Sequence, residues 1–153
     1  MTTGPGSTTL ESAACWTLLR STDLGRLAVA GPDGPDIFPV NFAVDHASVV
    51  FRTAPGSKLT ALTATPAVAF EVDGYDEAVG EAWSVVVKGR AQLVRGFLQL
   101  LDTADLPVYP WEASPKAQFV RIVADEVTGR RFARADPGRW QDPLSGVRSH
   151  PHD

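Results

Sequence analysis

Cysteine, histidine and long apolar runs are scarce in this chain of 153 residues, which has one cysteine and three histidines. The lone cysteine, Cys15, excludes an intrachain disulfide and a multi-cysteine metal site, and the histidines form no cluster that could hold structural zinc. No apolar stretch approaches the roughly 20 residues of a membrane-spanning helix. The N-terminus lacks the basic residues and the apolar run of a signal peptide. We therefore expect a cytoplasmic protein with no metal and no membrane contact.

Basic residues are fewer than acidic ones: the chain has 14 Lys and Arg residues against 18 Asp and Glu residues. The formal net charge is −4, whereas a general nucleic-acid binder depends on a basic face for its affinity. A hydrophobic fraction of 44% with 21% charged residues is ordinary for a globular protein. The length fits one domain with a full core, and nucleic acid is not expected as a partner.

The two ends of the chain differ in composition from its centre. Residues 1–8 are rich in Gly, Ser, Thr and Pro, and residues 136–153 are rich in Pro, Gly, Ser and His. Such segments bury little apolar surface, so we expect a disordered N-terminus and a flexible C-terminal tail. Residues 9–135 between them are predicted to form the folded domain.

This folded region is predicted to be mainly β. Thr8 and Glu11 have capping-box spacing and predict a helix over about residues 9–20. The Pro/Asp/Gly turn at residues 31–35 predicts a hairpin, and residues 73–81 are predicted to be an acidic loop. Strands at such short spacing predict a barrel or sandwich rather than βαβ units. The other predicted elements are short helices over 57–63 and 96–104 and strands over 26–30, 36–44, 47–53, 67–72, 83–94, 119–123 and 127–133.

The most informative motif lies where the strand 47–53 ends. Pro55 and Gly56 break the strand, and Ser57 and Lys58 then open a short helical segment. This order gathers backbone N–H groups, a hydroxyl and an ammonium at a helix start, where the helix dipole is positive, and so predicts a phosphate site. The alternative interpretation is an ordinary helix N-cap followed by a solvated lysine.

The strand 83–94 is the longest one predicted, with Trp83 on its apolar face and Ser84 on the opposite face. Gly89 interrupts the alternation, as expected of a β-bulge or a barrel corner. A tryptophan on the apolar face of a strand is more often a core residue than part of a cofactor wall. Because Trp83 and Ser84 project to opposite faces, both side chains can touch one ligand only if a bulge intervenes.

Three polar residues on other strands also need an explanation. Asn41 lies in an otherwise apolar strand and needs a partner if it is buried, which favours ligand or interface contact. Glu71 and Asp73 share one strand face, where we expect them to be rim charges or partners of Arg26 or Arg90 across strands rather than catalytic carboxylates.

Several short motifs occur together in a recognisable order along the chain. They are residues 25–28 (GRLA), 39–42 (PVNF), 51–53 (FRT) with 56–58 (GSK), 70–73 (FEVD), 83–87 (WSVVV) with Gly89, and 129–132 (GRRF). In this order the chain resembles the pyridoxamine 5'-phosphate oxidase-like family of FMN-binding split barrels. It is most similar to the short bacterial subgroup that includes nitroimidazole-resistance proteins. The resemblance covers about residues 10–133.

The resemblance implies a six-stranded antiparallel split β-barrel with short flanking helices, which forms a homodimer with FMN at the subunit interface. In the relatives, the corner between strand and helix grips the cofactor phosphate, and the flavin ring lies against the second strand and the start of the long strand. Carried over to this chain, the phosphate residues are Arg52, Thr53, Ser57 and Lys58. The ring residues are Pro39, Val40, Asn41, Phe42, Trp83 and Ser84.

The resemblance also implies a flavin-dependent oxidoreductase acting on a small molecule. Vitamin B6 oxidation is not expected, because the basic and aromatic residues that bind that substrate's phosphate have no clear counterpart here. One alternative is a deazaflavin coenzyme, whose long anionic tail could lie along Arg130, Arg131 and Arg134. Another is a flavin-binding or ligand-binding protein without turnover. No catalytic side chain is assigned, because the flavin itself carries the redox chemistry.

Overall fold

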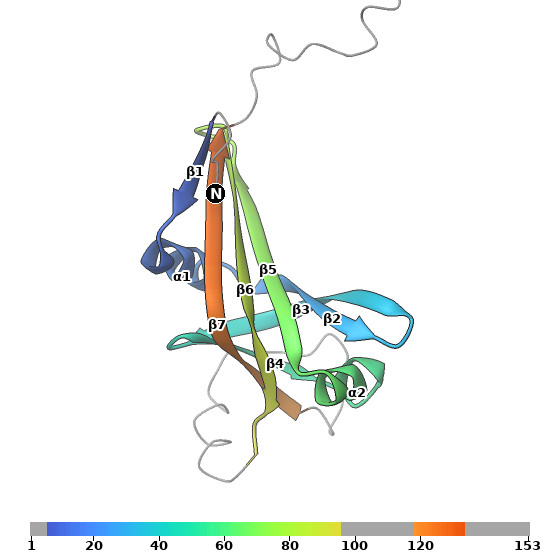
Figure 1. The fold of residues 1–153 in the computed structure, drawn as a ribbon. Helices are drawn as coiled ribbons and strands as arrows, with labels where there is room; N and C mark the ends of the chain where they lie inside the picture. The colour runs from blue at the N-terminus through green and yellow to red at the C-terminus, as the bar shows by residue number, and fades with distance from the viewer. Residues whose placement is uncertain (1–5, 96–117, 134–153) are drawn as a thin grey trace, which may run out of the picture.

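The computed structural model describes residues 6–95 and 118–133, and they form a mainly β structure with two short helices (Figure 1). The strands are β1 (Ser7–Leu10), β2 (Leu24–Gly31), β3 (Gly34–Asp45), β4 (Ser48–Thr53), β5 (Ala67–Asp76), β6 (Glu81–Leu93) and β7 (Gln118–Ala133). The helices are α1 (Ser12–Arg20) and α2 (Ser57–Ala64). No helix among these residues is long and apolar enough to cross a membrane.

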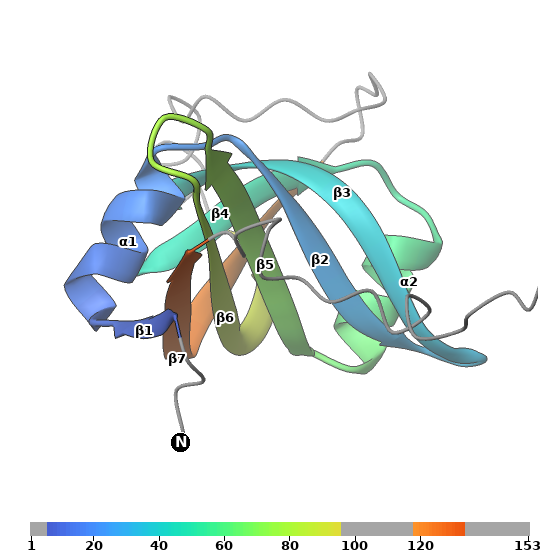
Figure 2. The same cartoon turned by 90° about the horizontal axis from the view of Figure 1, so that it is seen from above.

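The strands form one antiparallel sheet that closes on itself. Their order is β1-β7-β4-β3-β2-β5-β6, and a further pairing of β6 with β7 closes the ring (Figure 2). Because β1 pairs only with β7, the closed ring consists of the other six strands. This confirms the predicted six-stranded antiparallel barrel.

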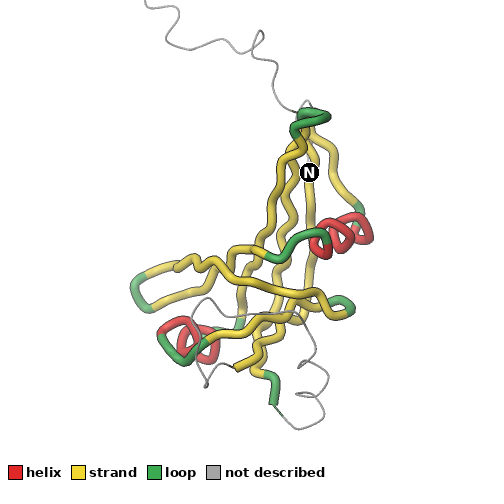
Figure 3. The backbone as a smooth tube through the Cα atoms, turned by 180° about the vertical axis from the view of Figure 1, so that it is seen from behind, coloured by secondary structure: helices red, strands yellow, loops and turns green. Residues whose placement is uncertain are grey.

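The long strand β7 gives the barrel its split form. Along one edge β7 pairs with β6, while the other edge pairs with β4 through residues 118–123 and with β1 through residues 129–132. Helix α1 packs against β7 through its buried residues Cys15 and Leu19. The two helices lie at separate places on the sheet, as the two red helices in Figure 3 show: α1 contacts β7, and α2 contacts β2 and β6.

The core fills the ring with aliphatic side chains and two phenylalanines in contact. Phe42 and Phe70 meet edge to face with their ring centroids 4.8 Å apart. Aromatic pairs of this geometry contribute about 0.5–1.5 kcal/mol beyond their buried area. The alternation of buried and exposed residues along β2 and β6 keeps one face of each strand in this core, as the sequence predicts.

The predicted bulge lies beside Gly89, and its extra residue is Asp125 on β7. The register between β6 and β7 shifts between Lys88 and Gly89. A Cβ atom at Gly89 would overlap the carbonyl oxygen of Val123 on β7, so only glycine lets the two backbones approach this closely.

The turn between β3 and β4 is fixed by a polar network. Arg121 on β7 forms an ion pair with Asp45, 2.9 Å between Nη2 and Oδ2, and also donates a hydrogen bond to Ser48. His46, in the left-handed region with φ 54°, lies with Nδ1 2.9 Å from Asp45 Oδ1. Arg20 at the end of α1 donates to the His46 carbonyl at 3.3 Å, which ties the helix to the turn.

At the N-terminal end the structure corrects the prediction. Residues 7–10 form β1, which pairs with β7, although the sequence analysis expected disorder up to residue 8 and a helix from residue 9. Helix α1 starts only at Ser12, its N-cap is Glu11, and no side chain caps it, so the predicted capping box does not form. The pairing edge that β7 offers outweighs the local capping signal.

Two further predictions are wrong in detail. The expected acidic loop 73–81 is shorter, because β5 continues to Asp76 in register with β6. The expected strand pair 119–123 and 127–133 is one strand of 16 residues. The predicted helix 96–104 and the predicted tail 136–153 lie outside the described residues.

Candidate functional site

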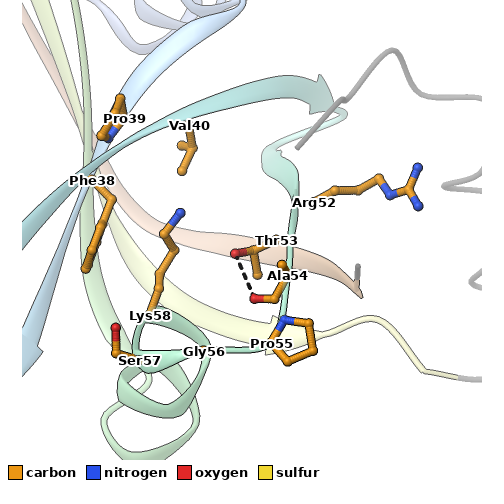
Figure 4. Close-up of a pocket in the computed structure, with 10 residues that line it drawn as sticks. All are labelled: Phe38, Pro39, Val40, Arg52, Thr53, Ala54, Pro55, Gly56, Ser57 and Lys58. Carbon is orange, nitrogen blue, oxygen red and sulfur yellow. Dashed lines mark hydrogen bonds between the residues drawn. The ribbon is translucent and has the colours of Figure 1, made fainter. Parts of the chain in front are cut away.

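A cleft of about 350 Å³ lies where β4 leads into α2, with one segment of β3 as its opposite wall (Figure 4). Its lining combines an apolar wall with a few polar groups, the composition typical of small-molecule sites. The lining residues are Phe38, Pro39, Val40, Arg52, Thr53, Ala54, Pro55, Gly56, Ser57 and Lys58.

The local sequence explains why a helix begins in this cleft. Gly56 is the N-cap of α2 in an extended conformation, and Thr60 N–H donates to its carbonyl at 3.0 Å. The N–H groups of the first turn have no acceptor earlier in the helix, and they lie at the edge of the cleft. The first turn carries no acidic residue. No carboxylate in this turn therefore neutralises the positive end of the helix dipole, which lies at the cleft.

Lys58 supplies the cation of this helix start. Its side chain rises from α2 towards β3, and its ammonium lies near Phe38 and Val40 in the interior of the cleft (Figure 4). Lys58 Nζ lies 5.1 Å from the centroid of the Phe38 ring, within the range of a cation–π interaction. Ser57, next to it at the start of the helix, is exposed.

Arg52 lies in the same lining but points elsewhere. Figure 4 shows its guanidinium directed away from Lys58, and its Cζ lies 5.0 Å from the centroid of the Phe119 ring on β7. Its Nε is buried and has no hydrogen-bond partner among the residues that the structure describes. The structure therefore does not bring Arg52 and Lys58 to a common point, and a shared grip on one phosphate stays a prediction.

Thr53 occupies the inner end of the strand. It is buried, and its hydroxyl donates a long hydrogen bond of 3.4 Å to the Ala54 carbonyl. This arrangement holds the chain at the corner before Pro55. Of the four predicted phosphate residues, Ser57 and Lys58 are the two that share the helix start.

The predicted ring residues divide into two groups. Pro39 and Val40 line the cleft, whereas Phe42 is part of the core and Asn41 is half-buried opposite Leu24 on β2. Phe38 also forms part of the wall, and the sequence analysis did not single it out. Phe38 could have been found from its spacing, because residues two apart in a strand share a face and Val40 was already predicted to contact the ring.

Trp83 and Ser84 lie near the start of β6 and are absent from the described lining of the cleft. Trp83 is paired with Gly74 on β5 and Arg131 on β7, and its indole covers Gly74. Arg130 and Arg131 point to opposite faces of β7 because they are adjacent in a strand, and Arg131 forms an ion pair of 3.4 Å with Glu81. Arg134 lies outside the described residues.

Glu71 and Asp73 pair with Arg26, one of the two partners that the sequence predicts. Arg26 Nη1 lies 3.5 Å from Glu71 Oε2 and 3.0 Å from Asp73 Oδ2. Desolvation and the neighbouring Asp73 carboxylate raise the pKa of Glu71 to about 7, against the opposing effect of Arg26. Glu71 and Asp73 lie on β5, next to β2, and neither they nor Arg26 line the cleft.

The fold and the site together define a small split β-barrel with a cleft in which the start of α2 and Lys58 face an apolar wall on β3. The chain matches the family described as pyridoxamine 5'-phosphate oxidase over residues 11–131. It is also 40% identical over 108 residues to the uncharacterized protein Rv3129 of Mycobacterium tuberculosis, which covers 70% of this chain and 96% of that protein. The chain therefore belongs to the pyridoxamine 5'-phosphate oxidase family, as its resemblance indicates.

Two solved structures give the same fold. The FAD binding protein of Mycobacterium smegmatis is 38% identical, with a TM-score of 0.69 over 82% of this chain and 97% of that one. A FAD-binding protein of Mesorhizobium loti is 26% identical, with a TM-score of 0.70 over 83% of this chain and 99% of that one.

Proposed function

We propose that this protein binds a flavin nucleotide, FMN, in the cleft between β3 and α2 and uses it to oxidise or reduce a small molecule. In this proposal the protein is a cytoplasmic homodimer with the cofactor at the subunit interface. A bound flavin supplies the redox-active ring, and the protein supplies binding, orientation and exclusion of water.

The observation that carries the proposal is the position of Lys58. Its ammonium lies inside the cleft at the positive end of α2, close to the N–H groups of the first helical turn. A flavin phosphate is a dianion, and charge-assisted hydrogen bonds from an ammonium, the Ser57 hydroxyl and backbone N–H groups are suited to hold it.

The opposite wall suits the remainder of the cofactor. Phe38, Pro39 and Val40 present an apolar surface on β3, and a flavin ring requires such a surface with a few backbone hydrogen bonds. The cleft volume is about 350 Å³, within the range of ordinary ligand pockets. The two solved structures named for FAD binding support a flavin cofactor in general. Because of these two proteins, FAD is the main alternative to FMN as the cofactor of this chain.

The cofactor is identified by denaturing the purified protein and analysing the released small molecule by mass spectrometry and visible spectroscopy. We expect FMN. Release of FAD or of a deazaflavin coenzyme would replace the proposed cofactor, and a colourless protein that binds none of them would overturn the proposal. Turnover is tested separately, by reduction of the bound flavin with NADH or NADPH and its reoxidation by small electron acceptors.

The site itself is tested by titrating the apoprotein with FMN. Replacing Lys58 with alanine is expected to weaken binding at least tenfold, or about 1.4 kcal/mol. Lys88, an exposed lysine on β6 outside the cleft, provides the matched control, and its replacement with alanine should leave the affinity unchanged. Equal affinities for the two variants would remove the phosphate assignment.

A further inference from the structure

A second cavity, of about 230 Å³, lies at the end of α2 that is remote from the proposed cofactor cleft. Its lining residues come from the last turn of α2, the loop after it, the end of β6 and the start of β7. None of them lines the cleft. Helix α2 contacts β6 (Figure 1), so this cavity lies where the helix covers one mouth of the barrel. Barrel mouths are common positions for ligand sites.

The floor of this cavity is apolar and belongs to the interior of the barrel. Leu93 on β6 pairs with Val120 on β7, and Ala91 faces the same side because it lies two residues from Leu93. Leu62 closes the floor from α2. Leu62, Ala91 and Val120 are all buried. A ligand seated here would therefore contact aliphatic groups from the helix and from both strands, which favours an apolar body.

Backbone hydrogen bonds hold the frame of the cavity in place. The Ala91 N–H donates to the Pro66 carbonyl at 2.8 Å, which fixes the loop after α2 against β6. The Val94 N–H donates to the Phe119 carbonyl at 3.0 Å, so the chain is still tied to β7 one residue before Arg95. A cavity framed in this way is formed before a ligand binds, which lowers the cost of binding.

Arg95 is the one charged residue among the described residues of this lining. It is exposed, and it has no ion-pair partner within residues 6–95 and 118–133. A guanidinium presents parallel N–H donors that match the two oxygens of a carboxylate. The cavity therefore combines an apolar floor with a single anion-binding group at its rim.

The end of α2 restricts the charge of the ligand. The Thr65 N–H donates to the Ala61 carbonyl at 2.9 Å, and the carbonyl groups that follow Ala61 have no partner within the helix. The last turn carries no basic residue, so the negative end of the helix dipole remains beside the cavity. One arginine opposite such an end suits a single negative charge better than a phosphate, whose charge is close to two.

We propose that this cavity is a second ligand site, which binds a small carboxylic acid with an apolar body. Arg95 holds the carboxylate, and the apolar body lies against Leu62, Ala91 and Val120. The volume of about 230 Å³ is below the roughly 300–1,000 Å³ of sites for drug-sized ligands, so the ligand is a smaller molecule. This site is independent of the proposed flavin site, because the two linings share no residue.

Calorimetric titration of the purified protein tests the class of ligand. The probe is 4-methylpentanoate, which joins a branched apolar chain to one carboxylate. We expect saturable binding of this probe, at least tenfold weaker binding of the neutral 4-methylpentanamide, and no binding of acetate or inorganic phosphate. The proposal would be overturned by no saturable binding of 4-methylpentanoate, by equal affinity for the amide, or by acetate or phosphate binding as tightly as the probe.

Two pairs of variants locate the probe in the cavity. Arg95→Gln removes the guanidinium, and its control is Arg90→Gln, at an exposed arginine of β6 outside the lining. Thr63→Phe fills the mouth from an exposed position on α2. Its control, Thr60→Phe, lies one turn earlier on the same helix, exposed and outside both linings. We expect Arg95→Gln and Thr63→Phe each to weaken binding of 4-methylpentanoate at least tenfold, and both controls to bind it as the wild type does.

FMN affinity is measured in the same variants, so that the two sites are judged separately. Neither Thr63 nor Arg95 lines the cleft, so FMN affinity should be unchanged in Arg95→Gln and Thr63→Phe. Wild-type affinity for 4-methylpentanoate in both of these variants would contradict the second site, even in a protein that binds FMN. Loss of probe binding in these two variants but not in their controls would support the second site, even in a protein that binds no flavin.

Discussion

Lys58 and Phe38 face one another within the cleft, with the ammonium nitrogen 5.1 Å from the ring centroid. The two residues come from different elements, α2 and β3, so their contact joins the proposed phosphate corner to the proposed ring wall. A lysine held by an aromatic face loses less conformational freedom when it binds an anion than one that moves freely in solvent.

Phe38 should therefore contribute to cofactor affinity without touching the phosphate. Phe38→Leu is expected to weaken FMN binding about twofold to fivefold, corresponding to the roughly 0.5–1 kcal/mol of a partly exposed cation–π contact. Phe38→Tyr keeps the aromatic face and should retain the affinity. Fluorescence titration of the two variants measures the difference, and equal losses in both would show that the ring does not act through Lys58.

Glu71 should make stability depend on pH in the neutral range. Its pKa is raised from 4.5 to about 7 in the folded protein, so between these values the folded state binds more protons than the unfolded state. Stability is then greatest below pH 4.5 as far as this group is concerned, and it falls as pH rises through 7. With partial solvent screening, we expect a loss of roughly 1–2 kcal/mol.

Urea denaturation of wild type and Glu71→Gln between pH 5 and pH 8 measures this effect. The glutamine variant cannot ionise, so its unfolding free energy should decline less across the range. Asp73 is replaced with asparagine in a second variant, which removes the neighbouring carboxylate and should lower the pKa of Glu71. Parallel pH profiles for wild type and Glu71→Gln would contradict the assignment.

Asp45 should have the opposite pH dependence. Its hydrogen bond and ion pair with Arg121 hold the pKa of the Asp45 carboxyl below its usual value. A depressed pKa contributes stability that is present above the unfolded value and is lost as pH falls through the folded one. Asp45→Asn is therefore expected to destabilise the protein at pH 7 by about 1–2 kcal/mol, with the difference shrinking towards pH 2.

The control for Asp45 is Asp33→Asn, because Asp33 is exposed at a turn and has no ion pair within the described part of the chain. Thermal unfolding at pH 7 and at acidic pH should separate the two variants only in the neutral measurement. A constant difference between them at all pH values would show that packing around the turn matters, and not the charge of Asp45.

Much of the barrel was predictable because local signals and long-range pairing agree. The Pro/Asp/Gly turn does join β2 to β3, with Gly31 paired to Gly34, and Gly89 does mark a register shift. Local signals failed where pairing decides. The segment 7–10 has no strand character of its own, yet it pairs with β7. Residues 124–126 (ADE) were expected to interrupt the strand, but they lie inside β7, because Ala124 and Glu126 pair with β6 and only Asp125 is left out of the pairing.

The candidate site divides in the same way. Ser57 and Lys58 were predictable because a strand, a Pro-Gly break and a helix start follow one another within ten residues. Arg52 was placed with them by sequence proximity, although its neighbours Phe51 and Thr53 are buried and strand alternation directs Arg52 to the opposite side. The contact of Lys58 with Phe38 joins two elements, and no local pattern shows it.

Gly89 and Gly56 offer a last comparison, because both glycines lie beside important features but face different surroundings. At Gly89 an added Cβ atom would overlap the Val123 carbonyl oxygen of the neighbouring strand, whereas nothing lies within 4 Å of a Cβ at Gly56. Gly56 is also in an extended conformation with φ 164°, which other residues can adopt. Gly89→Ala should therefore force the β6–β7 backbones apart and destabilise the protein by about 3 kcal/mol or more, and Gly56→Ala by less than about 1 kcal/mol. Thermal unfolding of the two variants measures this, and a similar melting temperature for both would mean that the bulge yields easily and that the close approach at Gly89 does not hold the long strands in register.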